Sequence, residues 1–186
     1  MEITKKPSFS TKIINGIIII FGSCILAISS KIQTPLSPVP ATMQTFAVLL
    51  LGMMFGYKIA TSSVILYLAE GAAGLPVFAT GGGLVYFMGP TSGYLLGFIA
   101  GAFFSGYIKI DSDPFLLLLK LIFSVSFIYL FGLIWLWINL NFFNGMELNF
   151  YEIFEKGAKP FLGIEAYKLC ILTIISKQIF KIRRLI

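Results

Sequence analysis

The chain has 186 residues, of which 58% are hydrophobic and only 12% are charged, whereas soluble domains carry roughly 25% charged residues. This balance excludes a water-soluble domain and predicts an integral membrane protein, in which the net charge of +6 comes from basic residues beside apolar segments and indicates orientation, not nucleic-acid binding. His is absent and the two cysteines, Cys24 and Cys170, lie far apart in apolar segments, so neither a metal site nor a redox pair is expected.

The apolar segments predict an all-α membrane bundle with six spanning helices. Because a span needs about 20 residues, the length leaves no room for a second folded domain, and residues 1–186 are expected to form a single membrane domain. Only a short break at Gly56 separates the second and third spans, which predicts a tight helical hairpin with a short, tilted or partly spanning second helix. The expected spans, in chain order, are residues 13–32, 43–55, 57–73, 93–107, 115–138 and 165–182.

Basic residues predict which end of the bundle faces the cytoplasm. Six spans place both termini on one side, and short loops rich in Lys and Arg are usually cytoplasmic. Residues 1–12 form a basic tail, and residues 177–184 end the chain with four basic side chains. Both termini are therefore expected in the cytoplasm, and the unusual loops, residues 74–92 and 139–163, on the outside. A ligand arriving from outside would meet these loops first, which favours capture or uptake.

Pro and Gly interrupt the apolar pattern between residues 37 and 89. Irregular backbone survives at membrane depth only where it is buried in protein or lines a cavity, so these loops are expected to shape a pocket. Tyr86 and Tyr94 lie in or beside the Gly-rich loop, residues 74–92. A phenol ring there can pack on an apolar ligand and form a hydrogen bond with it. The run Gly81-Gly82-Gly83 is not a phosphate-binding loop, because no Lys-Ser/Thr pair follows it.

Glu165 and Lys168 are the strongest candidates for polar ligand contacts, because ionisable groups inside a membrane are costly and mark functional sites. Their spacing of three residues places them on one face of a helix, at the start of the last span, where the helix N-terminus adds positive potential. They can offer an acceptor and a donor to one polar, anionic ligand. The alternative interpretation is an interfacial ion pair that extends to the headgroups. Glu70 is expected to be an interfacial anchor.

Small residues in the first span, Ser23 and Ala27, are four residues apart. In a bilayer, small residues at this spacing let helices approach closely. One interpretation is packing within the bundle, as for Gly97 and Gly101 in the fourth span. The other is that Ser23 and Ala27 dock a partner membrane protein.

Four segments carry specific motifs in a set order between residues 27 and 168. They are Pro38-Val39-Pro40-Ala41-Thr42-Met43-Gln44-Thr45, Gly71-Ala72-Ala73-Gly74-Leu75-Pro76-Val77-Phe78, Gly89-Pro90-Thr91-Ser92-Gly93-Tyr94-Leu95-Leu96-Gly97-Phe98, and Lys159-Pro160-Phe161 followed by Glu165 and Lys168. Together these motifs resemble the BioY family, the substrate-binding membrane subunits of biotin transporters of the energy-coupling factor (ECF) type.

The resemblance implies a six-helix bundle of the ECF S-component type that binds biotin near its outer face, with the loop after the first helix as a lid. It implies a cell-membrane protein that works with a transmembrane coupling protein and ATPase subunits, surrounded by lipid, with no cofactor and no catalysis of its own. It assigns Glu165 and Lys168 as polar partners of the ligand, Tyr94 to the pocket wall, and Ser23 and Ala27 to the surface that packs on the coupling protein.

Biotin combines an apolar ring and chain with a ureido group and a carboxylate. Such a ligand needs an aromatic-lined cavity, a hydrogen-bonding pair and a cation, which Tyr94, Gln44, Glu165 and Lys168 can supply. The family usually has Asp where this chain has Glu165, which is one methylene longer and alters the geometry of the acid.

Three other functions stay open at this point. A related S component could bind a different vitamin, since such subunits share the architecture and change the loops. An intramembrane enzyme would have to use Glu70 and Glu165 as acid and base, without His or a paired-carboxylate motif. A purely structural subunit would not need loops shaped around a ligand.

Overall fold

The structure, a computed structural model, describes residues 9–109 and 113–185. Most of the expected basic tail therefore lies outside the described residues, and the tail's last four residues, 9–12, form the start of α1. The elements in chain order are α1 (Phe9–Lys31), β1 (Gln33–Thr34), β2 (Ala41–Thr42), α2 (Gln44–Ala72), η1 (Leu84–Met88), α3 (Ser92–Gly106), α4 (Pro114–Ile138), η2 (Asn139–Phe143), α5 (Phe150–Gly157), η3 (Lys159–Phe161), α6 (Leu162–Ile174) and α7 (Ser176–Leu185).

The element α2 is a hairpin of two helices. Gly56 interrupts it with φ +78° and ψ 170°, a conformation that glycine adopts without steric cost. The side chain of Gln44 donates to the hydroxyl of Tyr67 at 2.7 Å, although these residues would lie about 35 Å apart in one straight helix. The two halves, residues 44–55 and 57–72, therefore fold back on each other, which confirms the predicted helical hairpin.

With this hairpin, the described residues form a six-helix membrane bundle, as the sequence predicts: α1, the two halves of α2, α3, α4, and α6 with α7. The last helix begins at Leu162 and is divided by a turn at Ile175, whereas the sequence predicts one helix over 165–182. Of these segments, α1 and α4 are each long and apolar enough to cross a membrane alone. The 15 residues of α3 rise only about 22 Å, less than the roughly 30 Å hydrocarbon core.

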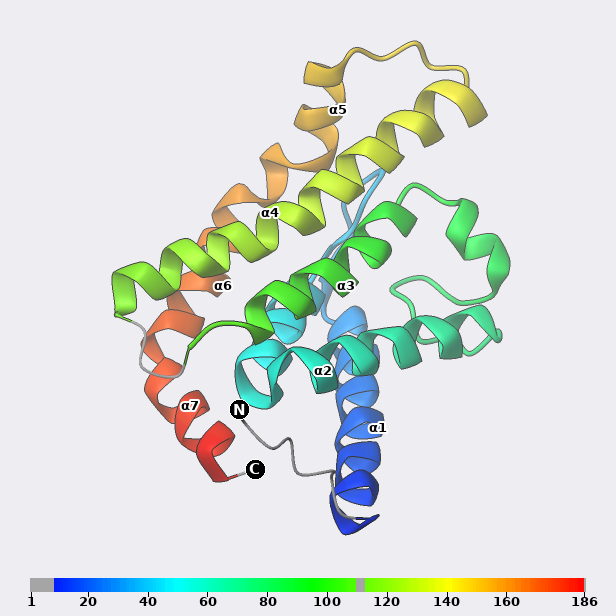
Figure 1. Ribbon diagram of the computed structural model, residues 1–186. Coiled ribbons are helices and arrows are strands. Elements are labelled where there is room, and N and C mark those ends of the chain that lie inside the picture. Colours follow the sequence, from blue (N-terminus) through cyan, green and yellow to red (C-terminus); the bar gives the residue numbers. More distant parts are fainter. Residues whose placement is uncertain (1–8, 110–112, 186) are drawn as a thin grey trace, which may run out of the picture.

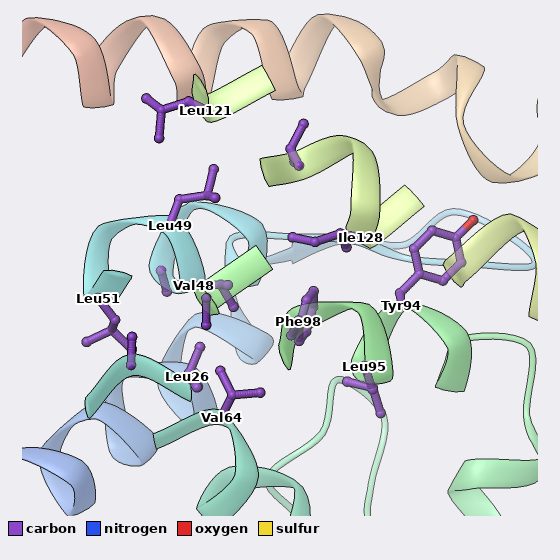
Figure 2. Close-up of a cluster of buried hydrophobic side chains, with 14 of the residues drawn as sticks. Leu26, Val48, Leu49, Leu51, Val64, Tyr94, Leu95, Phe98, Leu121 and Ile128 are labelled. Atoms are coloured by element: carbon purple, nitrogen blue, oxygen red, sulfur yellow. The ribbon is translucent and has the colours of Figure 1, made fainter. Parts of the chain in front are cut away.

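The helices pack around a core that draws side chains from α1 to α4. Leu26 of α1, Val48 and Val64 of the α2 hairpin, Phe98 of α3 and Ile128 of α4 are buried and lie close together in the cluster that Figure 2 shows. In Figure 1, α3 and α4 run side by side, and α7 follows α6 below α4; α6 packs on α4, whereas α7 packs on α2.

Glycines set the close contact between α3 and α4. A Cβ atom added at Gly97 would lie 2.8 Å from the backbone of Ile128, and one added at Gly101 would lie 2.7 Å from the Ile128 side chain. Real Cβ atoms essentially never lie this close to backbone atoms, so the contact at Gly97 is the stricter one, whereas the Ile128 side chain would have to shift at Gly101. The expected packing role of these two glycines is therefore confirmed.

Loops gather at one end of the bundle and are fastened there by hydrogen bonds to helix ends. Ser30 at the end of α1 donates to the Val77 carbonyl at 2.7 Å, and Trp135 of α4 donates to the Gly89 carbonyl at 2.9 Å. At the opposite end, Arg183 of α7 donates to the carbonyls of Ile108 and Gly106 at 2.9 and 3.0 Å. The Gly/Pro-rich loop, residues 74–91, is therefore held close to the ends of two helices.

The long loop after α4 contains a helix, α5, that our sequence interpretation did not predict. Its first turn has a capping box, in which the Asn149 side chain accepts from the Glu152 N–H and the Glu152 side chain accepts from the Asn149 N–H. An Asn followed three residues later by Glu is a sequence signature of a helix start. This signal was present in the sequence and could have located α5.

Candidate ligand-binding site

A small cavity of about 50 Å³ lies between the loop after α1 and the start of α6. Residues of the loop, including Val39, Pro40 and Ala41, form one side, and aromatic side chains of α3, α4 and η3 form another. We call this space the inner cavity and residues 33–43 the lid. The volume admits a few water molecules but is far below the roughly 300–1,000 Å³ of sites that enclose drug-sized ligands. The free space between the lid and the Glu165 side chain is therefore small.

A second, larger cavity of about 370 Å³ lies outside the first, between the lid and the Gly/Pro-rich loop. We call it the outer cavity. Pro40, Tyr86 and Thr91 line both cavities, so these three residues form the neck between them. A ligand that enters from the loop end of the bundle would pass the outer cavity first.

Lys168 stands at the centre of a buried polar cluster behind the inner cavity. Its ammonium donates to the Thr42 carbonyl at 2.7 Å, to Oγ1 of Thr45 at 2.8 Å and to Oε1 of Glu165 at 2.7 Å. An ammonium has three protons, so all of them are engaged. Lys168 is 2% and Glu165 7% exposed, which excludes the interpretation of a pair that extends to the headgroups. Lys168 does not itself line the inner cavity.

The two carboxylate oxygens of Glu165 differ in their surroundings. Oε1 accepts from Lys168 and also from the Thr45 hydroxyl, at 2.8 Å. Oε2 is buried and receives no hydrogen bond from the described residues, and the side chain lines the inner cavity. A buried charged group without a full set of donors is unfavourable. The carboxylate therefore keeps one unsatisfied acceptor. The Tyr129 hydroxyl is a polar neighbour of this side chain, which lines both the inner cavity and a space between α4 and α6.

Gln44 also lines the inner cavity, but its amide is held by neighbours. It donates to the Tyr67 hydroxyl at 2.7 Å and accepts from the Thr42 hydroxyl at 3.1 Å. The Tyr67 hydroxyl in turn donates to the Val77 carbonyl at 3.2 Å. One amide proton of Gln44 is left for another acceptor.

Tyr94 and Tyr86 contribute mainly ring surface to the site. The Tyr94 hydroxyl donates to the Gly157 carbonyl at 2.8 Å, while its ring lines the inner cavity. Tyr86 is half-buried and packs on Phe78 with 4.7 Å between ring centres. The structure thus brings Gln44, Tyr86, Tyr94 and Glu165 to one cavity and places Lys168 one layer behind it.

Three wall or support residues were not assigned from the sequence. Thr45 bridges Lys168 and Glu165, and Tyr129 and Phe161 line the inner cavity. Thr45 and Phe161 belong to motifs that carry the family resemblance, which was the available signal. Tyr129 is one aromatic residue among many in α4, and nothing in the sequence distinguished it.

Ser23 and Ala27 do not share an outward surface. Ser23 is fully buried, and its hydroxyl donates to Oε2 of Glu70 at 2.6 Å, because a half-buried carboxylate requires a donor. Ala27 is half-buried and packs against the core. A partner protein cannot contact Ser23 in this arrangement. Glu70, expected as an interfacial anchor, instead links α2 to α1.

Comparisons with known proteins agree on one family. The BioY family model matches residues 4–184. A biotin transporter BioY of Thermotoga maritima is 33% identical over 167 residues, covering 86% of this chain and 92% of the relative. A probable biotin transporter BioY of Pyrococcus horikoshii is 30% identical over 154 residues, covering 82% and 88%.

The fold is shared with a solved structure, the crystal structure of an S-component for biotin from an ECF-type ABC transporter. The two structures have a TM-score of 0.80 over 94% of this chain and 95% of the other, at 23% sequence identity. This likeness concerns the arrangement of the helices.

Proposed function

The chain belongs to the BioY family, and on that premise we propose that it is the membrane subunit that captures biotin for uptake driven by an ECF module. It is a multi-pass transport protein and not an enzyme. The observation that carries the proposal is the inner cavity beneath the lid, whose aromatic walls lie beside the Glu165 side chain and its unsatisfied Oε2. An apolar ring with N–H donors complements these surroundings.

The ureido group of biotin supplies those donors. A ureido N–H can bond Oε2 of Glu165, whereas the carboxylate of biotin would be repelled by this oxygen. The ring system would lie against Tyr94, Phe98 and Phe161, which line the cavity. The ureido end therefore enters first. The lid must move outward to admit the ring, since the inner cavity offers only about 50 Å³.

Lys168 supports this site from behind. It holds the Glu165 side chain in position through Oε1, and it binds the base of the lid through the Thr42 carbonyl. It can contact the ligand directly only by exchanging one of its three bonds. Thr42 belongs to the lid, so outward movement of the lid would break the bond from Lys168 to the Thr42 carbonyl. The proton freed in this way is the one that could bind the ligand.

Energy for uptake comes from partner proteins in this proposal. A coupling membrane protein and ATPase subunits would bind the S component, with Ala27 of α1 in the contact and Ser23 supporting it from inside. Both termini lie in the cytoplasm of a cell-membrane protein. Lys58 and Lys109 support this orientation, because they follow closely on Gly56 and Ile108, which both lie beside Arg183 of α7.

The other functions considered are less well supported. An acid–base pair of Glu70 and Glu165 does not fit, because Glu70 binds Ser23 and does not line the inner cavity. A different vitamin would have to present N–H donors to the same carboxylate, and the test below includes two such vitamins.

Calorimetric titration of the detergent-purified protein tests the proposal. Biotin should bind one to one, and thiamine and riboflavin should give no heat. Glu165→Gln should weaken biotin binding at least tenfold. The matched control is Glu155→Gln, which removes an exposed carboxylate paired with Lys159 on α5 and η3 and should leave binding unchanged. Absence of biotin binding by folded, ligand-free protein would contradict the proposal.

A further inference from the structure

The outer cavity is neutral. The described residues that line it carry no charge, and its polar groups are amide, hydroxyl and backbone groups, with Gln33, Ser37, Thr80 and Thr91 among them. The three protons of Lys168 are engaged elsewhere, and Lys168 lines neither cavity. Lys31 at the end of α1 directs its ammonium to the Phe78 carbonyl at 2.6 Å and does not line the outer cavity either.

The orientation of the ligand decides what occupies this neutral space, and this step rests on the proposed function. If the N–H donors of the ring meet Oε2 of Glu165, the acid chain points away from α6. It then passes the neck formed by Pro40, Tyr86 and Thr91 and ends in the outer cavity. The carboxylate at its end meets hydroxyls, amides and water, and forms no ion pair with a residue that lines this cavity.

We propose that the site recognises the ring and chain of its ligand but not the negative charge, so that neutral amides of the same acid belong to its substrate class. An amide keeps a carbonyl acceptor and adds N–H donors. It loses no ion pair relative to the acid, because the outer cavity is lined by uncharged residues. It also loses less hydration than a carboxylate does. Larger amides, in which the acid is joined to an amine such as a lysine side chain, can extend from the outer cavity toward water.

Titration of the same detergent-purified protein with biotin and with its primary carboxamide tests this proposal. The two affinities should agree within fivefold, and biotin affinity should change little between about 0.05 and 0.5 M salt, where exposed ion pairs are strongly screened. A carboxamide that binds more than fivefold weaker than biotin would overturn the proposal. If biotin itself does not bind, the proposed function fails first, and this inference fails with it.

A charge added to the outer cavity provides a second test. Thr80 is exposed on the Gly/Pro-rich loop and lines the outer cavity, so Thr80→Lys should not disturb the fold. It should tighten the acid roughly two- to fivefold, as expected for an exposed ion pair, and leave the carboxamide unchanged. Thr80→Gln is the neutral control of similar length. Equal affinity of the acid for the two variants would place the carboxylate outside this cavity and overturn the proposal.

Discussion

Lys168→Met is expected to destabilise the protein strongly, because it leaves the Glu165 carboxylate buried without its cationic partner. The wild-type ammonium and the Glu165 carboxylate are 2.7 Å apart, and their side chains are 3% and 9% exposed. Removing one partner of a buried pair typically costs about 3–5 kcal/mol, because the other charge remains buried without compensation. The substitution also takes a donor from the Thr42 carbonyl and from Thr45.

The magnitude can be checked by thermal unfolding in detergent, followed by circular dichroism. For a chain of this size, a loss of 3–5 kcal/mol lowers the midpoint by at least about 6 °C. The double variant Lys168→Met with Glu165→Gln should recover much of the loss, since it leaves no unpaired charge. Both variants should bind biotin poorly. The double variant should therefore regain stability but not binding, which separates the two effects.

Lys159→Met is the matched control. Lys159 also pairs with a glutamate, Glu155, at 2.6 Å, but these side chains are 58% and 40% exposed. Water compensates the loss of either charge at such a site, so little change in midpoint is expected. The reasoning would be refuted if Lys168→Met lowered the midpoint no more than Lys159→Met, or if the double variant were less stable than Lys168→Met alone.

Two further predictions concern helix packing, and both are measured by denaturant unfolding in detergent. Gly97→Ala should lower the free energy of unfolding by about 1–3 kcal/mol, because the new methyl group meets the backbone of α4. The control Gly163→Ala, where nothing lies within 4 Å of the new methyl group, should leave it unchanged. Equal effects of the two substitutions would contradict the close contact between α3 and α4. Ser23→Ala should cost about 1–3 kcal/mol, because a carboxylate of α2 loses its donor, whereas Ser126→Ala removes only a bond to its own exposed helix. An unchanged free energy of unfolding for Ser23→Ala would argue against the hydrogen bond from the Ser23 hydroxyl to Glu70.

Regular features of the bundle were predictable because they depend on local patterns. Long apolar segments predicted α1 and α4. Gly56 indicated the turn of the hairpin, since glycine tolerates a positive φ at a sharp break. The turn at Ile175 was not predicted, although the continuous apolar segment ends there and Ser176-Lys177-Gln178 follows it. The helix α5 was missed although its capping box is visible in the sequence.

The candidate site was predictable in part. Glu165 and Gln44 were assigned to the site because both belong to recognisable motifs, and both line the inner cavity. The place of Lys168 behind that cavity was not predictable, because a spacing of three residues sets the helix face but not the neighbours of each atom. Ser23 was expected on a partner surface and lies buried against Glu70.

The sequence by itself determined that the chain is a membrane bundle, how its helices follow one another, and which family it resembles. Composition and spacing are sufficient for these features, because a bilayer allows few arrangements of apolar segments. Only the tertiary structure decided that Lys168 makes three hydrogen bonds, that Oε2 of Glu165 receives none from the described residues, and that the outer cavity is lined by uncharged residues. These properties arise where the lid, α2 and α6 meet, and contacts between segments far apart in the chain are set by packing.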